Sequence, residues 1–232
     1  DNLCSLESKW YIQTQSAQYF GHGCEIQVPA DYDGDNSIEI AVFNPATHLW
    51  KIKDLTQFYF GQAGDNLVPA DYNGDGTDDP AIFRPDTTLW NIRNISVCWY
   101  GEFGDIPVPA DYNGGGAIDI AVLRASESKW YIKSLSSMVY GTTGDIPIPA
   151  DYSGDSKADV AIFRPSDSSW RVKDYSVFYY GDEGDYLIPK DYNGDGTAEA
   201  AVFRPGMGLW AITNFTSFYW GGARSSSRRG LG

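Results

Sequence analysis

Carboxylate side chains are concentrated in five nine-residue segments of this 232-residue sequence, and each segment begins 40 residues after the previous one. The segment 71–79 reads DYNGDGTDD, and its counterparts begin at Asp31, Asp111, Asp151 and Asp191. Like charges repel at this spacing, so their collection in one loop indicates a positive partner. Oxygen donors at alternate positions of a tight, glycine-containing loop are the arrangement that a hard cation such as Ca²⁺ requires.

The segment 71–79 offers five such donors. Counted from the first residue, the odd positions hold Asp71, Asn73, Asp75, Thr77 and Asp79. Position 7 would contribute its backbone carbonyl, and the glycines at positions 4 and 6 permit the turn. The spacing is similar to the start of an EF-hand loop, but here a strand is expected to follow, and the last acid stands at position 9.

The 40-residue period extends over the whole chain. It is marked by tryptophans at Trp10, Trp50, Trp90, Trp130, Trp170 and Trp210. Around them hydrophobic and polar residues alternate, as in the segment LWNIRN at 89–94, which is the pattern of a β-strand. Each repeat contains four such short segments between turn residues, and none shows helical spacing of its apolar residues. Four-stranded units of this length predict an all-β protein, a β-propeller with one blade per repeat, whereas a β-sandwich does not predict strict repetition.

The number of blades depends on the two ends of the chain. We treat 1–232 as a single propeller domain, with five complete repeats over 22–221, a partial blade over 1–21 and a tail over 222–232. If the tail supplies the missing strand, both termini close a sixth blade, and this is the prediction we adopt. Two alternatives stay open: five blades with a spare N-terminal hairpin, or an unclosed edge that pairs with another chain.

An acidic loop of this form between two strands, repeated every 40 residues, resembles the FG-GAP/VCBS family of calcium-binding β-propellers, which includes the heads of integrin α-chains. The Phe-Gly of that family is matched at Phe20-Gly21 and Phe60-Gly61 and becomes Tyr-Gly or Trp-Gly in the other repeats. The Gly-Ala-Pro of the family is replaced, for example by Phe-Arg-Pro at Phe83. The resemblance covers nearly the whole chain, and it implies the fold and the metal rather than a ligand.

The resemblance implies Ca²⁺ ligands at positions 1, 3, 5, 7 and 9 of each acidic loop. In the first loop these are Asp31, Asp33, Asp35, Ser37 and Glu39, and in the second Asp71, Asn73, Asp75, Thr77 and Asp79. In the fourth loop they are Asp151, Ser153, Asp155, Lys157 (through its backbone) and Asp159, and in the fifth Asp191, Asn193, Asp195, Thr197 and Glu199. The third loop has Gly115 at position 5, which leaves Asp111, Asn113 and Asp119 and predicts the weakest site. Four to five bound Ca²⁺ ions are therefore expected.

The formal net charge of −14 agrees with this hypothesis, because nearly half of the 31 acidic residues stand at ligand positions. Solvated Asp/Gly turns, which are common between strands, are the alternative, but five such loops in register favour calcium. The same charge argues against nucleic acid and anionic membrane surfaces as partners. No apolar run approaches the roughly 20 residues that span a bilayer.

Several other residues have predicted structural roles. The repeated tryptophans alternate with Ile or Val, which favours core packing over sugar stacking, and the non-repeating Phe103 and Tyr186 are candidates for exposed aromatic residues. Cys4 and Cys24 could form a disulfide in an oxidising compartment. Recurring arginines predict a bond between neighbouring strands or loops, at Arg84, Arg124, Arg164 and Arg204.

The sequence contains no nucleophile elbow, phosphate loop or Cys/His cluster, so we expect a binding protein rather than an enzyme. The expected function is that of an extracellular or cell-surface, calcium-stabilised binding or adhesion module, with a glycan or protein ligand and carbohydrate as the first guess. Two alternatives are a structural protein that self-associates through its termini and a polysaccharide-active enzyme with paired carboxylates.

Overall fold

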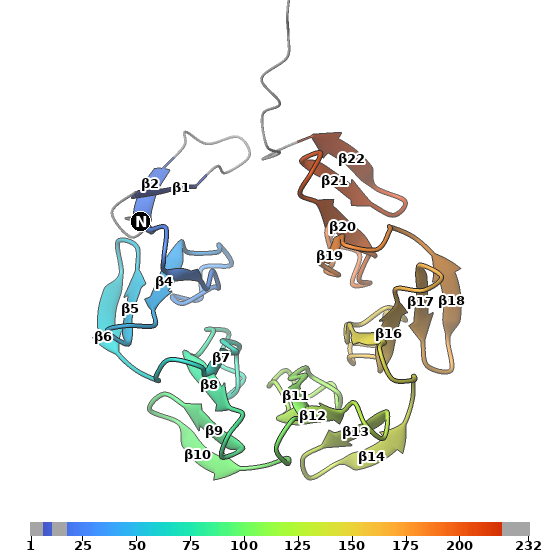
Figure 1. Ribbon diagram of the computed structural model, residues 1–232, viewed down its shortest axis with the longest axis horizontal. Coiled ribbons are helices and arrows are strands. Elements are labelled where there is room, and N and C mark those ends of the chain that lie inside the picture. Colours follow the sequence, from blue (N-terminus) through green and yellow to red (C-terminus); the bar gives the residue numbers. More distant parts are fainter. Residues whose placement is uncertain (1–6, 11–17, 220–232) are drawn as a thin grey trace, which may run out of the picture. The chain divides into compact units, whose positions relative to one another are not determined.

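The computed structural model describes residues 7–10 and 18–219, which form an all-β chain of four-stranded antiparallel blades of the β-propeller type (Figure 1). Five blades are complete within these residues. A two-stranded sheet precedes them and consists of β1 (Glu7–Trp10) and β2 (Gln18–His22). Within the described ranges, no helix is long and apolar enough to cross a membrane.

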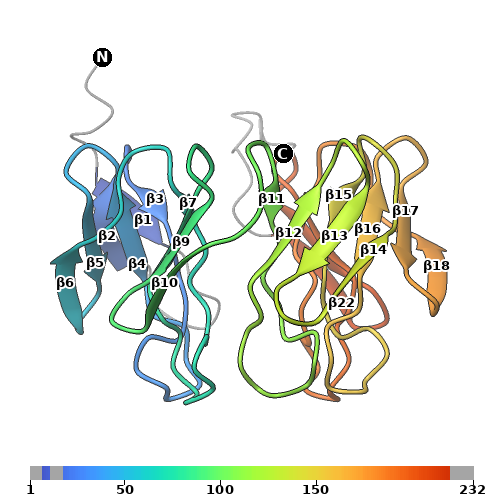
Figure 2. The same cartoon turned by 90° about the horizontal axis from the view of Figure 1, so that it is seen from below.

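The chain divides into two compact units, Asp1–Thr143 and Gly144–Gly232. The first unit holds the two-stranded sheet and three blades: blade 1 with β3 (Ile26–Gln27), β4 (Ala41–Asn44), β5 (Leu49–Ile52) and β6 (Thr56–Tyr59); blade 2 with β7 (Asn66–Leu67), β8 (Ala81–Arg84), β9 (Leu89–Ile92) and β10 (Ser96–Trp99); and blade 3 with β11 (Ile106–Pro107), β12 (Ala121–Arg124), β13 (Lys129–Ile132) and β14 (Ser136–Val139). The second unit holds blade 4 with β15 (Ile146–Pro147), β16 (Ala161–Arg164), β17 (Ser169–Val172) and β18 (Ser176–Tyr179), and blade 5 with β19 (Tyr186–Leu187), β20 (Ala201–Arg204), β21 (Leu209–Ile212) and β22 (Thr216–Tyr219). Figures 1 and 2 show each blade as a separate sheet with its strands in sequence order.

The repeated tryptophans are packing residues, as the alternation predicts. In blade 2, Trp90 pairs with Phe83 across the β8–β9 hairpin and is fully buried. Its indole N–H donates a hydrogen bond to the carbonyl of Tyr100, 3.1 Å away. Trp50, Trp130 and Trp170 are equally buried, so these side chains stabilise the blades and are not available for stacking on a sugar.

The first strand of each blade is only two residues long. In blade 2, β7 ends before Pro69, which has no N–H to donate to a ladder. The chain pairs once more at an isolated bridge between Ala70 and Asp79, and the other four blades contain the same bridge. The acidic loop lies between the two sides of this bridge, so the sheet fixes both of its ends.

The recurring arginines form the predicted bond between elements. Arg84 donates from Nε to Asp65 Oδ1 at 2.8 Å and from Nη2 to Asp65 Oδ2 at 3.0 Å. The same two-pronged pair recurs, as Arg124–Asp105, Arg164–Asp145 and Arg204–Asp185. Each pair ties the start of a blade to the end of its second strand.

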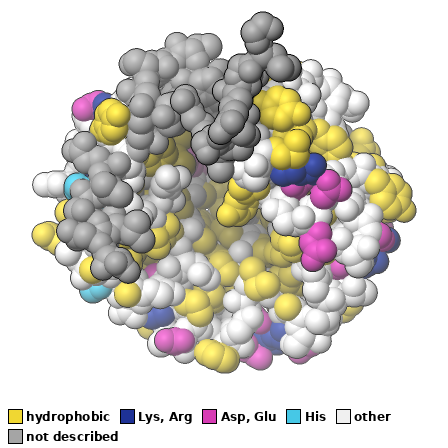
Figure 3. Space-filling view, turned by 45° about the horizontal axis from the view of Figure 1, so that its top comes forward, with side chains coloured by type: hydrophobic (Ala, Val, Ile, Leu, Met, Phe, Trp, Pro, Cys, Tyr) yellow, Lys and Arg dark blue, Asp and Glu magenta, His cyan; other side chains and the backbone are white. Residues whose placement is uncertain are grey.

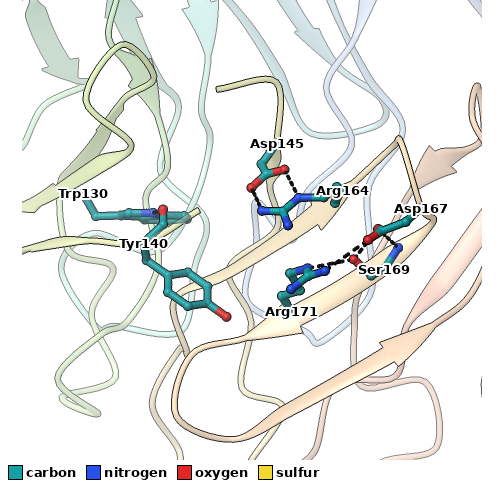
Figure 4. A network of polar contacts seen from close by, with 7 residues as sticks. All are labelled: Trp130, Tyr140, Asp145, Arg164, Asp167, Ser169 and Arg171. Atoms are coloured by element: carbon teal, nitrogen blue, oxygen red, sulfur yellow. Dashed lines mark hydrogen bonds and ion pairs between the residues drawn. The ribbon is translucent and has the colours of Figure 1, made fainter. Parts of the chain in front are cut away.

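Figure 4 shows the Arg164–Asp145 pair beside a second polar network of blade 4. In that network the Ser169 hydroxyl donates to Asp167, and Arg171 Nε donates to the Ser169 hydroxyl oxygen at 2.8 Å. Ser169 is fully buried, and these bonds satisfy its hydroxyl.

Within the described residues the blade count is five, which matches the alternative prediction and not the six blades that we adopted. These residues contain five complete blades and the hairpin β1–β2. The tail 222–232, which was expected to close a sixth blade, lies outside the described residues, so this closure stays a prediction. Cys4, the first partner of the predicted Cys4–Cys24 disulfide, also lies outside them.

Candidate metal centre

Each acidic loop is closed at its base by the tyrosine at position 2. The Tyr72 hydroxyl donates to the Val68 carbonyl at 2.8 Å, and the Tyr72 backbone N–H donates to Asp79 Oδ2 at 3.1 Å. Burial raises the pKa of Tyr72 well above its usual value, so the hydroxyl remains a donor. Position 2 is bonded to position 9 in the same way in the other loops, through Tyr32–Glu39, Tyr112–Asp119, Tyr152–Asp159 and Tyr192–Glu199. These bonds turn the last acid of each loop back toward its first residues.

The aspartate at position 1 closes the loop from the other side. Asp71 Oδ1 accepts the N–H of Gly74 at 2.6 Å, and Asp71 Oδ2 accepts the N–H of Gly76 at 2.8 Å. Both glycines have positive φ, +77° and +88°, which side chains rarely adopt. Positions 4 and 6 therefore fold the chain around the carboxylate of position 1.

Two of the loops bring at least three carboxylates together. In the first loop, one oxygen from each of Asp31, Asp33, Asp35 and Glu39 lies within 4.8 Å of the others, and in the fifth loop Asp191, Asp195 and Glu199 are grouped in the same way. Two oxygens that each lie 2.3–2.6 Å from one Ca²⁺ ion are at most about 5 Å apart. The oxygen-only donor set and its spacing thus fit a hard cation at positions 1, 5 and 9, with position 3 added in the first loop.

The second and fourth loops carry acids at positions 1, 5 and 9, but in the described chain these acids are not grouped as closely. Their position-5 carboxylates are fixed by the backbone of position 7: Asp75 accepts the N–H of Thr77 at 2.9 Å, and Asp155 that of Lys157 at 3.0 Å. The same bond forms between Asp35 and Ser37 in the first loop and between Asp195 and Thr197 in the fifth. At position 3, Asn73 and Asn193 accept the N–H of position 5, while Ser153 donates toward position 1.

The third loop satisfies its carboxylate without a third acid. The Asn113 amide donates to both oxygens of Asp119, at 2.8 and 2.9 Å. Asp111 accepts the N–H groups of Gly114 and Gly116 as in the other loops, so the loop keeps its shape although Gly115 provides no side chain. The Asn193 amide of the fifth loop donates to Glu199 in a similar way, at 2.7 Å, so the weakness of the third site stays a prediction that rests on Gly115.

The acid at position 9 has a raised pKa in the first and second loops. Burial raises the pKa of Glu39, and the charges of Asp33, Asp31 and Asp35 add to the rise. Burial likewise raises the pKa of Asp79, with the charges of Asp75 and Asp71 acting in the same direction. The loops therefore hold negative charge at a cost that a bound cation would remove.

Within each unit, the acidic loop of one blade is bonded to the loop of the next blade. The Asp78 N–H donates to the Asp31 carbonyl at 2.7 Å, and the Asp31 N–H donates to Asp78 Oδ2 at 2.9 Å. Position 8 also donates to position 1 of the preceding loop from Ile118 to Asp71, at 2.8 Å, and from Ala198 to Asp151, at 2.6 Å. The position-1 residue therefore holds its own loop together and anchors the next one.

Two sets of acidic residues with contacts in the structure were not predicted from the sequence. Asp78 is not a predicted ligand, although an acid at position 8 is unusual in this chain, since the other loops carry Ile or Ala there. The partners of the recurring arginines are the aspartates of a Gly-Asp pair that repeats every 40 residues, at Asp65, Asp105, Asp145 and Asp185. The acid at position 8 and the repeated Gly-Asp pair are both visible in the sequence, but neither belongs to positions 1, 3, 5, 7 and 9, where cation ligands were expected.

Comparisons with known proteins give no match: no family model, no curated protein and no solved structure matches this chain. The case for its function therefore comes from the loops and the surface alone.

Proposed function

We propose that this protein is an extracellular, calcium-stabilised binding or adhesion module of the FG-GAP/VCBS type. The observation that carries the proposal is the grouping of Asp31, Asp33, Asp35 and Glu39 within 4.8 Å, repeated in reduced form at Asp191, Asp195 and Glu199. Repulsion among these carboxylates favours a divalent cation, and the oxygen-only donor set favours Ca²⁺ over softer metals. We propose four to five ions, with the third loop binding most weakly.

The role of the ions in this proposal is structural. Position 1 accepts hydrogen bonds from its own loop and from the next blade, as Asp31 does from Gly34 and Asp78. An ion that fixes Asp31 would therefore stabilise both the loop and the junction between blades 1 and 2. Loops with the affinity of extracellular modules are filled at millimolar Ca²⁺ and are mostly empty at cytosolic levels.

A binding function is supported by what the surface offers. Phe103 is 80% exposed and Tyr186 is 62% exposed, so both are accessible to a ligand, as predicted. In the face shown in Figure 3, hydrophobic side chains reach the surface among acidic ones. Aromatic side chains surrounded by polar groups suit a glycan, which we take as the first candidate ligand by analogy with other propellers.

A glycan array probed in millimolar Ca²⁺ and again in EGTA tests the proposal, with the melting temperature followed in parallel. We expect binding to defined glycans that disappears in EGTA, together with a lower melting temperature. A lower melting temperature without any glycan signal would transfer the binding role to a protein ligand. If EGTA left the melting temperature unchanged and elemental analysis found no retained metal, the calcium proposal would be wrong.

Self-association is the second candidate, because the last strand of each complete blade has an exposed edge. Within the described residues, β6, β10, β14, β18 and β22 each have a neighbour on one side only. A large hydrophobic residue is exposed at the same position of each strand, at Tyr59, Trp99, Val139, Tyr179 and Tyr219. Exposed strand edges of this kind can pair with another chain.

Sedimentation velocity over a range of protein concentrations distinguishes the two candidates. A self-assembling protein would form larger species as concentration rises, and the double variant Tyr59→Ser/Trp99→Ser would reduce them. A sedimentation coefficient that is independent of concentration would exclude self-association as the main function.

A further inference from the structure

A cavity of about 230 Å³ lies between blades 2 and 3, inside the first unit. Its walls are formed by Ile92, Ile95 and Ser96 of blade 2 and by Ile118, Lys133 and Ser134 of blade 3. Asp119 also lines the cavity. Polar groups supply more of its exposed lining than the isoleucine side chains do, and this volume is below the roughly 300–1,000 Å³ of pockets for drug-sized ligands.

Two substitutions distinguish this junction from the one between blades 1 and 2. There, the guanidinium of Arg93 in blade 2 lies over the ring of Phe58 in blade 1, 3.9 Å from its centroid. One repeat later the same positions hold Lys133 and Cys98, which are a thinner cation and a much smaller side chain. Burial raises the pKa of the Cys98 thiol, and the charge of Lys133 opposes this rise.

Lys133 also lacks the partner that equivalent lysines have. Lys53 and Lys173 each form an ion pair with the aspartate that follows them, Asp54 and Asp174. Ser134 replaces this aspartate after Lys133, and in the described part of the chain Lys133 forms no ion pair. The cavity therefore contains a positive charge that no side chain neutralises directly.

The carboxylate of Asp119 provides the opposite polarity in the same cavity. It accepts hydrogen bonds from the Tyr112 N–H and from the Asn113 amide, which hold it in position. Its oxygens still have lone pairs for a further donor. Ser96 and Ser134 add hydroxyl groups, and the isoleucines add apolar surface.

We propose that this cavity binds a small carboxylate ligand, whose carboxylate pairs with Lys133 and whose hydroxyl or ammonium group donates to Asp119. Two sources have this chemistry and fit the size: a terminal uronic acid of a glycan, and a free amino acid. The inference rests on the proposed binding function, for which it supplies a ligand class, and because Asp119 is also position 9 of the third loop, it assigns this carboxylate to the ligand rather than to a cation.

Ligand-observed NMR titrations of the full chain in millimolar Ca²⁺ test the site with sodium glucuronate, glucose and alanine as probes. The expected result is binding of glucuronate without binding of glucose, which has the same ring but no carboxylate. Lys133→Gln should weaken glucuronate binding at least about tenfold, because a hydrogen bond to a charged group is lost. Lys173→Gln, at the equivalent position of blade 4, should leave the affinity unchanged.

A second variant tests the cavity without removing its charge. Cys98→Phe/Lys133→Arg recreates the side chains found between blades 1 and 2 and should abolish binding while preserving the melting temperature. Binding of alanine in place of glucuronate, with the same loss in Lys133→Gln, would support the site and identify an amino acid as its ligand. Equal binding of glucose and glucuronate, no binding of either carboxylate, or equal effects of Lys133→Gln and Lys173→Gln would overturn the proposal. Failure of the calcium proposal would instead be seen in the melting temperature, which these titrations do not use.

Discussion

At the scale of single residues, the ionised carboxylate of the buried Asp185 stabilises blade 5, and this stabilisation is lost at low pH. Only 2% of its side chain is exposed, and Arg204 donates to both of its oxygens at 2.8 Å. The hydrogen bonds from Arg204 lower the pKa of Asp185 below its usual value although burial opposes the shift. This contribution to stability is present above the unfolded-state pKa, about 3.9, and is lost as the pH falls through the lower folded-state pKa.

We predict that Asp185→Asn lowers the free energy of unfolding by about 2 kcal/mol at pH 7, because Arg204 loses a charged partner. Urea unfolding at pH 7 and pH 3 measures the effect, and the difference between wild type and variant should shrink at pH 3. Asp182→Asn is the matched control, because Asp182 contacts the same arginine but has a 69% exposed side chain. Its effect should stay below about 0.5 kcal/mol. Equal losses in both variants would contradict the assignment.

Gly115 is the residue that distinguishes the third loop from the other four. A side chain at this position would meet Asn113 Oδ1 at 2.5 Å and displace an amide that otherwise donates hydrogen bonds to Asp119. We predict that Gly115→Asp increases the number of bound Ca²⁺ ions by one or tightens the weakest site, because it restores the acid at position 5. Isothermal titration calorimetry measures the stoichiometry. Gly115→Ala introduces the same crowding without a carboxylate and should produce no gain.

At the scale of elements, the hydrogen bonds between Asp31 and Asp78 predict coupling between the first two loops. Asp78→Ala removes the acceptor for the Asp31 N–H and should weaken Ca²⁺ binding to the first loop about fivefold, the effect of one lost hydrogen bond of about 1 kcal/mol. Tb³⁺ luminescence titrations measure the change. Asp78→Asn keeps an acceptor and removes only the charge, so it separates the two contributions. An unchanged titration curve in Asp78→Ala would show that the loops bind independently.

The elements differ in how far the sequence determines them. Strand positions could be predicted because Trp90 and Ile92 alternate with polar residues and because the same pattern recurs every 40 residues. The grouping of Asp31, Asp33, Asp35 and Glu39 followed from their spacing, because all four belong to one loop. These features are local in sequence, and local patterns carry most of the information that a single sequence offers.

Features that involve two repeats could not be predicted in this way. Position 8 gives no sign in the sequence that its N–H reaches the loop of the previous blade, as that of Ile118 reaches Asp71. The cavity beside Lys133 is lined by residues of two repeats, such as Ile95 and Ile118, which become neighbours only when blades 2 and 3 pack together.

At the scale of the whole molecule, the net charge of −14 makes stability depend on ions in two separate ways. A specific ion bound at the loops stabilises the folded chain by mass action, about 2.7 kcal/mol for each site at a ligand concentration of 100 Kd. Salt acts without a site, by screening repulsion over a Debye length that falls from about 30 Å at 0.01 M to 3 Å at 1 M. The two effects can be distinguished because screening matters only while the carboxylates remain uncompensated.

We therefore predict that EGTA lowers the melting temperature at low ionic strength by at least roughly 5–10 °C, the shift expected for each well-filled site that is lost in a chain of this size. Raising NaCl to 1 M should restore part of this loss in EGTA and change the melting temperature little in Ca²⁺. Differential scanning calorimetry at both ionic strengths measures the four values. If the acidic loops were only solvated turns, Ca²⁺ and EGTA would give the same melting temperature at each ionic strength. If repulsion among carboxylates such as Asp31, Asp33 and Glu39 were not what the cation relieves, salt would have the same effect with and without Ca²⁺.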